Sequence, residues 1–304
     1  MAYIVQYIKD FSDVAKVRAV CEKYTALAYK VKVFTHSKNF SDLKIENVTF
    51  EYCENPVEQA VLSAHSLYAE KCQFYMERGG IYSVDPYLFP QAEKIREMDY
   101  DEALELSANG YNDISQEVIL VAKRNSVRLE ILSFDDDEPT TIKEVSGVSE
   151  KIIQSITKDT DLAVVTLTEI PDKKGITYHI FKALSDENLY VDSIMLPAAN
   201  QHQQDISFCI KSEDRQKVEQ VLLANQQQLN FKDIIIRSNI AKISVMGAAF
   251  QTQSGIAAKL LEVLYKSDIN IMMIFTSEVK ISVVLERSHA DWAIHEIHKH
   301  MIRQ

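Results

Sequence analysis

The side chains best suited to chemistry are spread thinly along this chain of 304 residues. His295 and His298 would share one face of a C-terminal helix, but no cysteine lies near them. A solvated helix end is therefore favoured over a metal site, and no metal is predicted. The cysteines lack metal-type spacing and are expected to be buried free thiols in a reducing cytoplasm: Cys21, Cys53, Cys72 and Cys209.

Phosphate-binding loops depend on glycine, and the first glycine of this chain is Gly79. A loop that cradles phosphate with backbone N–H groups needs glycine for close approach. We therefore predict no phosphate-binding site in the N-terminal segment. The acidic run from Asp135 to Glu138 has the charge to bind a cation, but we interpret it as part of a solvated linker.

Composition limits the partners and the location of the protein. The net charge of −11 argues against a nucleic-acid partner, which requires a basic face. The apolar fraction of 46% is sufficient for a packed core, and the length predicts two or three domains. No apolar run approaches a membrane span, and the first ten residues lack the features of a secretory signal. We expect a cytoplasmic protein with no nucleic-acid and no membrane partner.

The second half of the chain contains the same order of predicted strands and helices twice. The later copy predicts strand 241–246, helix 255–266, two strands within 271–284 and helix 288–301. The earlier copy predicts strand 162–167, helix 176–186, strands 190–196 and 205–210, and helix 212–225. Aligning Gly175 with Gly255 brings the two copies into register. The pattern predicts two small sensor modules with helices on one face of each sheet.

The later copy ends in a helix and lacks a fourth strand. The segment from Glu150 to Ile156 has no other assignment. We predict that it completes the second sheet, so that the first module is inserted into the second. The N-terminal part predicts an αβ segment in which helices alternate with strands near residues 3–7, 29–34, 42–50, 72–75 and 127–132.

Several motifs resemble those of the aspartokinase family. Segments 82–86 and 98–106 resemble the family's Tyr-Thr-x-Asp-Pro-Arg and Ser-Tyr-Asp-Glu-x-Leu-Glu-Leu. Segment 170–175 resembles the Val-Pro-Asp-Lys-Pro-Gly of its first ACT domain, and segment 275–282 the Ser-Thr-Ser-Glu-Ile-Lys-Ile-Ser of its second. The resemblance covers residues 60–301.

The resemblance implies an α/β (α+β) fold with two parts. A truncated, divergent domain similar to amino-acid kinases would occupy residues 1–142. A tandem ACT regulatory domain would occupy residues 143–304. Within it, the first ferredoxin-like βαββαβ module (160–236) would be inserted into the second (148–158 plus 237–304).

The resemblance also implies a remnant of a nucleotide site, at Tyr75, Glu77, Tyr82 and Asp85. The family's Lys-Phe-Gly-Gly strand and Gly-Arg-Gly-Gly-Ser-Asp loop are missing here. The family's Gly-Ala-Lys-Val-Leu-His-Pro-Arg corresponds to residues 110–117 here, where the anionic Glu117 takes the place of the final arginine. Phosphoryl transfer depends on positioning and electrostatic stabilisation. We therefore predict no catalytic residue, and Mg-ATP as a cofactor only if the chain is a kinase.

The effector site of the family binds lysine or threonine between two chains. The matching positions are Asp172, Gly175, Ile176, Val191 and Asp192 in the first module, and Thr276, Ser277 and Glu278 in the second. Asp192 would accept the ammonium of the effector, and the Gly175 and Ile176 amides its carboxylate. The alternative interpretations make Asp172 a turn residue and helix N-cap, and the segment 276–278 a hairpin turn at a dimer interface.

Three functional hypotheses remain open from the sequence. The first is an amino-acid-sensing ACT regulatory chain that works as a homodimer or in association with a complete aspartokinase. The second is a divergent but active aspartate kinase that phosphorylates the aspartate side chain with ATP. The third is a structural remnant without a ligand. Formation of aspartyl phosphate separates the second hypothesis from the others, and binding of an amino acid separates the first from the third.

Overall fold

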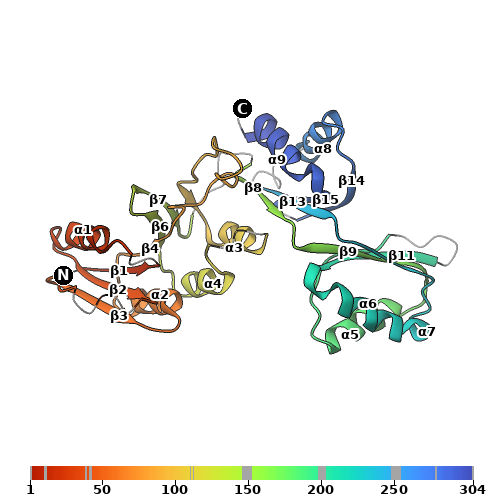
Figure 1. The fold of residues 1–304 in the computed structure, drawn as a ribbon, viewed down its shortest axis with the longest axis horizontal. Coiled ribbons are helices and arrows are strands. Elements are labelled where there is room, and N and C mark those ends of the chain that lie inside the picture. The colour runs from red at the N-terminus through yellow and green to blue at the C-terminus, as the bar shows by residue number, and fades with distance from the viewer. Residues whose placement is uncertain are drawn as a thin grey trace. The chain divides into compact units, whose positions relative to one another are not determined.

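The computed structural model describes residues 2–9, 12–37, 40, 43–109, 111, 113–145, 153–197, 203–247, 255–277 and 279–302. These residues belong to two compact units. Figure 1 shows the chain coloured from red at the N-terminus to blue at the C-terminus. One unit lies within residues 1–157, 245–254 and 301–304, and the other within residues 158–244 and 255–300. Among the residues described, no helix combines the length and apolar character needed to cross a lipid bilayer.

A seven-stranded sheet organises the first unit, in the order β3-β2-β1-β4-β6-β7-β5. The pairings are parallel except for the antiparallel β6–β7 pair. Inner strands of a parallel sheet are buried on both faces, and β1 is accordingly buried at five of its six positions and β4 at four of its five. The strands are β1 (Tyr3–Ile8), β2 (Lys30–Thr35), β3 (Val48–Tyr52), β4 (Lys71–Tyr75), β5 (Glu97–Met98), β6 (Leu129–Ser133) and β7 (Asp136–Ile142).

Helices cover both faces of this sheet. Helix α1 (Val14–Thr25) lies on one face, and α2 (Pro56–Ser66), α3 (Tyr100–Ala108) and α4 (Gln116–Arg124) lie on the other (Figure 1). Because successive side chains of a strand point to opposite faces, Ile4 packs with the α1 side and Val5 with the α2 side. Helix α3 begins at a capping box between Asp99 and Glu102, at the acidic helix start that the sequence predicts.

The interpretation of the acidic run as part of a linker is wrong. Its residues form the turn of the β6–β7 hairpin and the first part of β7. The carboxylates of the run are paired with cations of the protein itself. The ion pairs are Asp135–Lys16, Asp136–Lys94, Asp137–Lys23 and Glu138–Arg96.

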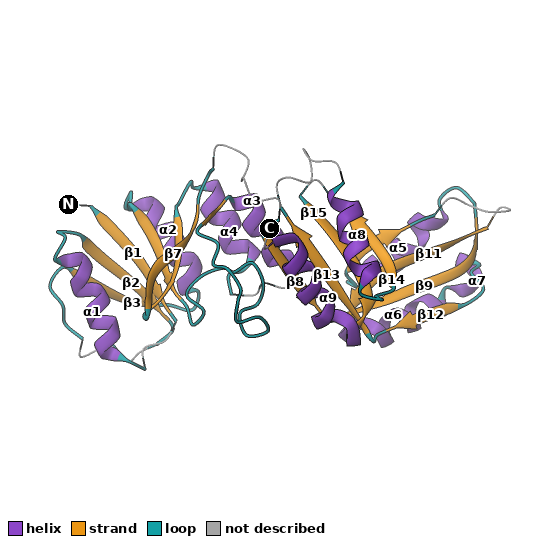
Figure 2. Cartoon of the chain, turned by 90° about the horizontal axis from the view of Figure 1, so that it is seen from above, coloured by secondary structure: helices purple, strands orange, loops and turns teal. Residues whose placement is uncertain are grey.

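The first module is a four-stranded antiparallel sheet in the order β10-β11-β9-β12. Helices α5 (Ile176–Asp186), α6 (Arg215–Ala224) and α7 (Gln226–Leu229) cover one face of it, as Figures 1 and 2 show. Phe208 of the sheet packs there against Ile180 of α5 and Val218 of α6. The strands are β9 (Leu162–Pro171), β10 (Val191–Met195), β11 (Gln203–Lys211) and β12 (Ile234–Arg237).

The second module repeats this topology in the order β14-β15-β13-β8. Strand β8 (Ser155–Asp159) precedes the whole first module in the chain, so the first module is inserted into the second, as predicted. The completing strand begins later than the predicted segment, whose residues 150–152 lie outside the described part. The other elements are β13 (Ile240–Met246), α8 (Ile256–Lys266), β14 (Ile271–Thr276), β15 (Lys280–Glu286), η3 (Arg287–His289), α9 (Ala290–Ile297) and η4 (His298–Ile302).

The two modules share unusual backbone conformations as well as topology. Gly175 and Gly255 precede α5 and α8 with φ of 90° and 92°, and both have ψ of −7°. After these helices, Asn188 and Asp268 adopt φ of 56° and 57°. Asparagine and aspartate tolerate the left-handed region better than most residues do. Matched conformations at both ends of the helix support the internal repeat.

The structure shows the state and burial of the cysteines and of the C-terminal histidines. All four cysteines are free, and Cys53 alone among them is partly exposed. His298 is 1% exposed, so the expectation of a solvated helix end is wrong for this residue. His295 stacks on Trp292 and lies 3.0 Å from the Glu296 carboxylate. Among the described residues, no histidine, cysteine and carboxylate side chains converge in a group suited to a metal ion.

Candidate functional site

The turn before α5 carries three of the predicted effector residues. Asp172 and Gly175 are exposed, and Ile176 is buried at the first position of the helix. Gly175 is the N-cap and makes no side-chain cap, so Asp172 is not the N-cap that the alternative interpretation required. The Ile176 N–H already donates to the Lys173 carbonyl at 3.1 Å. Of the two amides expected to bind a carboxylate, one is therefore engaged within the turn.

Val191 and Asp192 lie side by side on β10, the edge strand of the first module. Asp192 pairs with Cys209 of β11, and the register shifts immediately after it, where Ser193 has a φ of 52°. Such a bulge bends an edge strand and redirects a side chain. Asp192 is 31% exposed, so its carboxylate is partly open to solvent.

The Asp192 carboxylate is held by a lysine that the sequence analysis did not single out. Lys242 of β13 donates to Asp192 Oδ2 at 2.6 Å, and the Lys242 side chain is 6% exposed. Burial raises the pKa of Asp192, but the hydrogen bond and charge of Lys242 outweigh burial and hold the pKa below its ordinary value. Lys242 is the one charged residue in the strand Ile-Ala-Lys-Ile-Ser-Val-Met, and this pattern was the available signal.

The predicted residues of the second module lie in the β14–β15 hairpin. Thr276 is the exposed last residue of β14 and pairs with Ile281. Ser277 is exposed, and its N–H donates to the Lys280 carbonyl at 2.8 Å. Glu278 lies outside the described residues. The hairpin agrees with the structural interpretation of this segment and leaves the Thr276 and Ser277 side chains accessible.

The residues predicted as a nucleotide-site remnant differ widely in accessibility. Tyr75 is 5% exposed and stacks on Phe134 with ring centroids 5.1 Å apart, and burial raises its pKa. Glu77 is exposed, and it accepts a hydrogen bond from the Tyr87 hydroxyl at 3.4 Å. The Tyr82 hydroxyl donates to the Arg78 carbonyl at 3.2 Å. Tyr75 is thus part of the core, while the others lie near Arg78.

Arg78 is neutralised by carboxylates on both sides. Its guanidinium lies 3.7 Å from Asp85 and 3.6 Å from Asp113, and it stacks over the Tyr87 ring at 5.3 Å. Asp113 belongs to the segment in which the family carries cations. With Glu77 beside them, these four ionisable groups carry a net negative charge, which repels phosphate rather than binding it.

The glycines at this turn serve close packing. Gly79 has a φ of 65°, and a Cβ atom added there would lie 2.7 Å from Ser133 Oγ. The backbone amide of Ile81, two residues further on, donates to Thr140 Oγ1 at 2.9 Å. Gly79 is therefore required by its conformation and by its neighbour in β6.

A row of buried polar side chains crosses the centre of the seven-stranded sheet. Gln6 of β1, Gln73 of β4 and Glu130 of β6 are direct neighbours in register. Gln6 Nε2 donates to Gln73 Oε1 at 3.0 Å, and Gln73 Nε2 donates to Glu130 Oε2 at 2.9 Å. Lys71 and Arg128 pair with the Glu130 carboxylate at 3.2 Å and 2.7 Å. This fully bonded row has the character of a structural network that fixes strand register.

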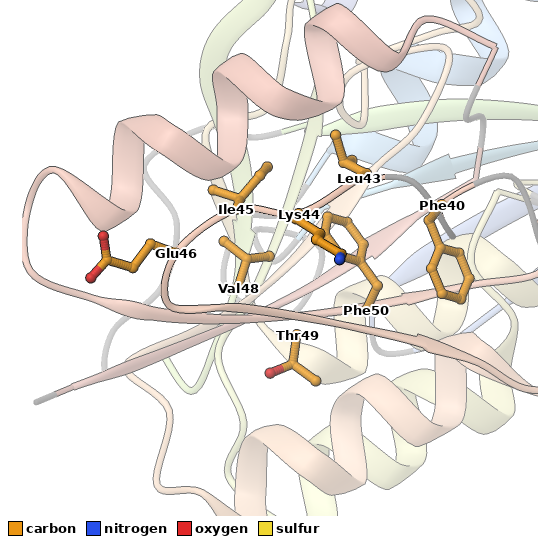
Figure 3. Close-up of a pocket in the computed structure, with 8 residues that line it drawn as sticks. All are labelled: Phe40, Leu43, Lys44, Ile45, Glu46, Val48, Thr49 and Phe50. Atoms are coloured by element: carbon orange, nitrogen blue, oxygen red, sulfur yellow. The ribbon is translucent and has the colours of Figure 1, made fainter.

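A surface hollow of about 560 Å³ lies beside β3, the edge strand of the seven-stranded sheet (Figure 3). None of the predicted site residues lines it. Its walls come from β3 and the segment before it: Phe40, Leu43, Lys44, Ile45, Glu46, Val48, Thr49 and Phe50.

Comparisons with known proteins divide the chain in the same way. A model of the amino acid kinase family matches residues 58–133, and a model of the ACT domain matches residues 243–301. An aspartate kinase of Pseudomonas putida is 32% identical over 241 residues, which are 78% of this chain and 59% of that protein. The chain spans 58% to 60% of the length of the first curated relatives that it matches.

Solved structures extend the likeness in fold. A crystal structure of Clostridium acetobutylicum aspartate kinase matches with a TM-score of 0.74 and 20% identity, over 81% of this chain and 57% of that one. E. coli aspartokinase III, solved with aspartate and ADP, matches with a TM-score of 0.68 and 15% identity, over 98% of this chain and 70% of that one. The second match extends the similarity of fold to the N-terminal strands that carry none of the quoted motifs.

Proposed function

This chain belongs to the aspartokinase family and carries an ACT regulatory domain, and we propose that it is an amino-acid-sensing regulatory chain with an incomplete ATP site. The observation that carries the proposal is the pairing of Arg78 with Asp85 and Asp113. A phosphoryl-transfer site needs cations that are available to the phosphates. Here the arginine at the nucleotide-site remnant is already neutralised.

The proposed ligand is an amino acid, lysine or threonine, bound at the edge of the first module. Asp192 offers a carboxylate that stays ionised, and the Gly175 turn lies at the N-terminus of α5, where the helix dipole favours a carboxylate group. Thr276 and Ser277 of a second chain would complete the site, with Glu278 beside them. The chain would thus act in regulating the biosynthesis of lysine, threonine and methionine in the cytoplasm.

The proposed assembly is a dimer through the ACT modules, with a second copy or with a complete aspartokinase. Strands β10 and β14 are the edges of their sheets, and exposed edges are normally covered. Ile194 and Ile274 occupy equivalent positions of these two edges and are 50% and 36% exposed. The proposed boundaries are 1–142 for the kinase-like domain and 143–304 for the tandem ACT domain.

A thermal-shift titration of the full chain tests the proposal. The ligands are lysine, threonine, methionine, aspartate and Mg-ATP, one at a time. A ligand at about 100 times its Kd adds about 2.7 kcal/mol of stability, which is readily detected. We expect a shift with lysine or threonine and none with Mg-ATP.

Two variants sharpen this test. Asp192→Asn should abolish the amino-acid shift, whereas Asp186→Asn, which changes an exposed carboxylate on α5 paired with Lys182, should preserve it. Formation of aspartyl phosphate by the pure chain, or a shift with Mg-ATP and aspartate, would overturn the proposal in favour of an active kinase. The absence of any amino-acid shift would also contradict it.

A further inference from the structure

Lys242 is an unusual residue in its strand. Strand β13 is buried at every position from Ile240 to Met246, and Lys242 is its one charged side chain. A lysine is almost never fully buried without a partner. Its partner, Asp192, comes from the first module, so one ion pair joins the central strand of the second module to the edge strand of the first.

The internal repeat shows what this interface looks like without the ion pair. In the register that aligns Gly175 with Gly255, Asp192 corresponds to Met272 and Lys242 corresponds to Leu162. Leu162 and Met272 both belong to an apolar cluster that joins the helix-free faces of the two modules. An apolar pair therefore suffices for packing at the equivalent position. Buried ion pairs are also weak contributors to stability compared with apolar pairs.

We propose that Lys242 is a positioning residue of the effector site: it holds Asp192 Oδ2 in place and keeps the carboxylate charged, so that the remaining acceptor positions receive the ammonium of the amino acid. This inference rests on the proposed amino-acid-sensing function. A carboxylate has about four acceptor positions, and Lys242 uses one. Asp192 is 31% exposed, so a ligand can reach it, whereas Lys242 is 6% exposed.

The burial of Lys242 indicates whether the effector binds Asp192 together with Lys242 or displaces Lys242 from it. If the effector displaced Lys242 from Asp192, it would leave a buried ammonium without its partner, which is strongly unfavourable. The lysine therefore stays in place when the effector binds. Because Lys242 belongs to the second module, the site of the first module then depends on the correct seating of the second.

The charged surroundings of Asp192 define how the site responds to pH. The groups that face it are Lys242 of β13, Lys280 of β15 and the Cys209 thiol of β11. Without Lys242, burial would be opposed by Ser193 and Lys280 alone, and the pKa of Asp192 would move upward. Effector binding would then weaken as the pH falls, because a protonated carboxyl no longer attracts the ammonium.

Calorimetric titration of the full chain with lysine and with threonine between pH 5 and pH 7.5 tests this role. We expect Lys242→Met to weaken binding by about tenfold or more for each unit by which the pKa of Asp192 rises above the working pH. The pH at which half of the binding is lost should also move upward. Lys242→Arg keeps the charge and should restore the wild-type pH profile, even if its Kd differs.

The matched control is Lys158→Met. Lys158 of β8 pairs with Asp291 of α9 at the same distance of 2.6 Å, but it does not touch Asp192. Its profile should follow the wild type. Wild-type binding with an unchanged pH profile in Lys242→Met would overturn the positioning role and leave the proposed function intact. If the wild type binds neither amino acid, the proposed function fails, and this inference fails with it.

Discussion

Replacement of Gly175 by alanine tests the geometry of the candidate site most directly. Gly175 has a φ of 90°, and no described atom lies within 4 Å of the position of an added Cβ. The change therefore introduces backbone strain without a steric clash. An alanine in a left-handed conformation costs about 1–2 kcal/mol, and the lower entropy of its unfolded chain returns about 0.4–1 kcal/mol.

The net destabilisation is about 1 kcal/mol, or about 3 °C in Tm for a unit of this size. Differential scanning fluorimetry measures it. Gly255→Ala is the matched control, because Gly255 has a φ of 92° and equally open space around its Cβ position. Both variants should lose the same stability, but only Gly175→Ala should weaken the binding of lysine or threonine.

Three results would contradict this reasoning. An unchanged or raised Tm in both variants would show that the left-handed conformation carries no strain. Equal losses of amino-acid binding in both variants would show that the effector does not use the turn before α5. Unequal stability losses would contradict the equivalence of the two module backbones.

Three further predictions concern stability and reactivity. Glu130→Ala should destabilise the chain by about 3 kcal/mol, because it removes a buried acceptor from Gln73, whereas Glu138→Ala, at an exposed ion pair, should stay within about 0.5 kcal/mol in thermal unfolding. The Asp192–Lys242 pair stabilises the fold above the ordinary carboxyl pKa of about 3.9 and loses this effect as the pH falls through the lower folded value, so the Tm of Asp192→Asn should fall less than that of the wild type as the pH is lowered below about 4. Burial raises the pKa of Cys21 and Cys209 to about 12 and raises that of Cys72, so iodoacetamide at pH 8 should modify Cys53 first, as seen by mass spectrometry; equal modification of Cys72 in the native protein would contradict the burial argument.

The repeated modules were predictable because their signals are local. The helix predicted over 176–186 has the same limits in the structure, since Gly175 precedes it, its apolar face repeats at helical spacing, and Asn188 ends it with a left-handed turn. The insertion of the first module into the second followed from counting strands. The start of β8 was placed too early because a short strand without a turn signal has no sharp boundary in sequence.

The missed features depend on partners that are distant in the chain. The acidic run looked like a linker because nothing in its neighbourhood revealed Lys16 and Lys23, which lie on α1. Asp192 was predicted as an effector ligand, but its pairing with Lys242 joins two strands of different modules. The roles of the remaining effector residues stay predictions. Asp172, Gly175 and Ser277 lie in exposed turns, whereas Ile176 is buried and Glu278 lies outside the described residues.

The place of β8 in the second module has a consequence for how the chain is made. On the ribosome, β8 emerges before the entire first module, but its neighbour β13 emerges only afterwards. The first module has all its strands by Arg237 and can fold at once, while β8 remains an unpaired edge that invites association with other chains. The sheet of the second module is therefore completed late, when β13 pairs with β8 after the first module has already folded between them in the sequence. A nascent chain arrested between the two modules would expose β8, and protection of Ser155–Asp159 from proteolysis would report that β13 has emerged from the ribosome and paired with it.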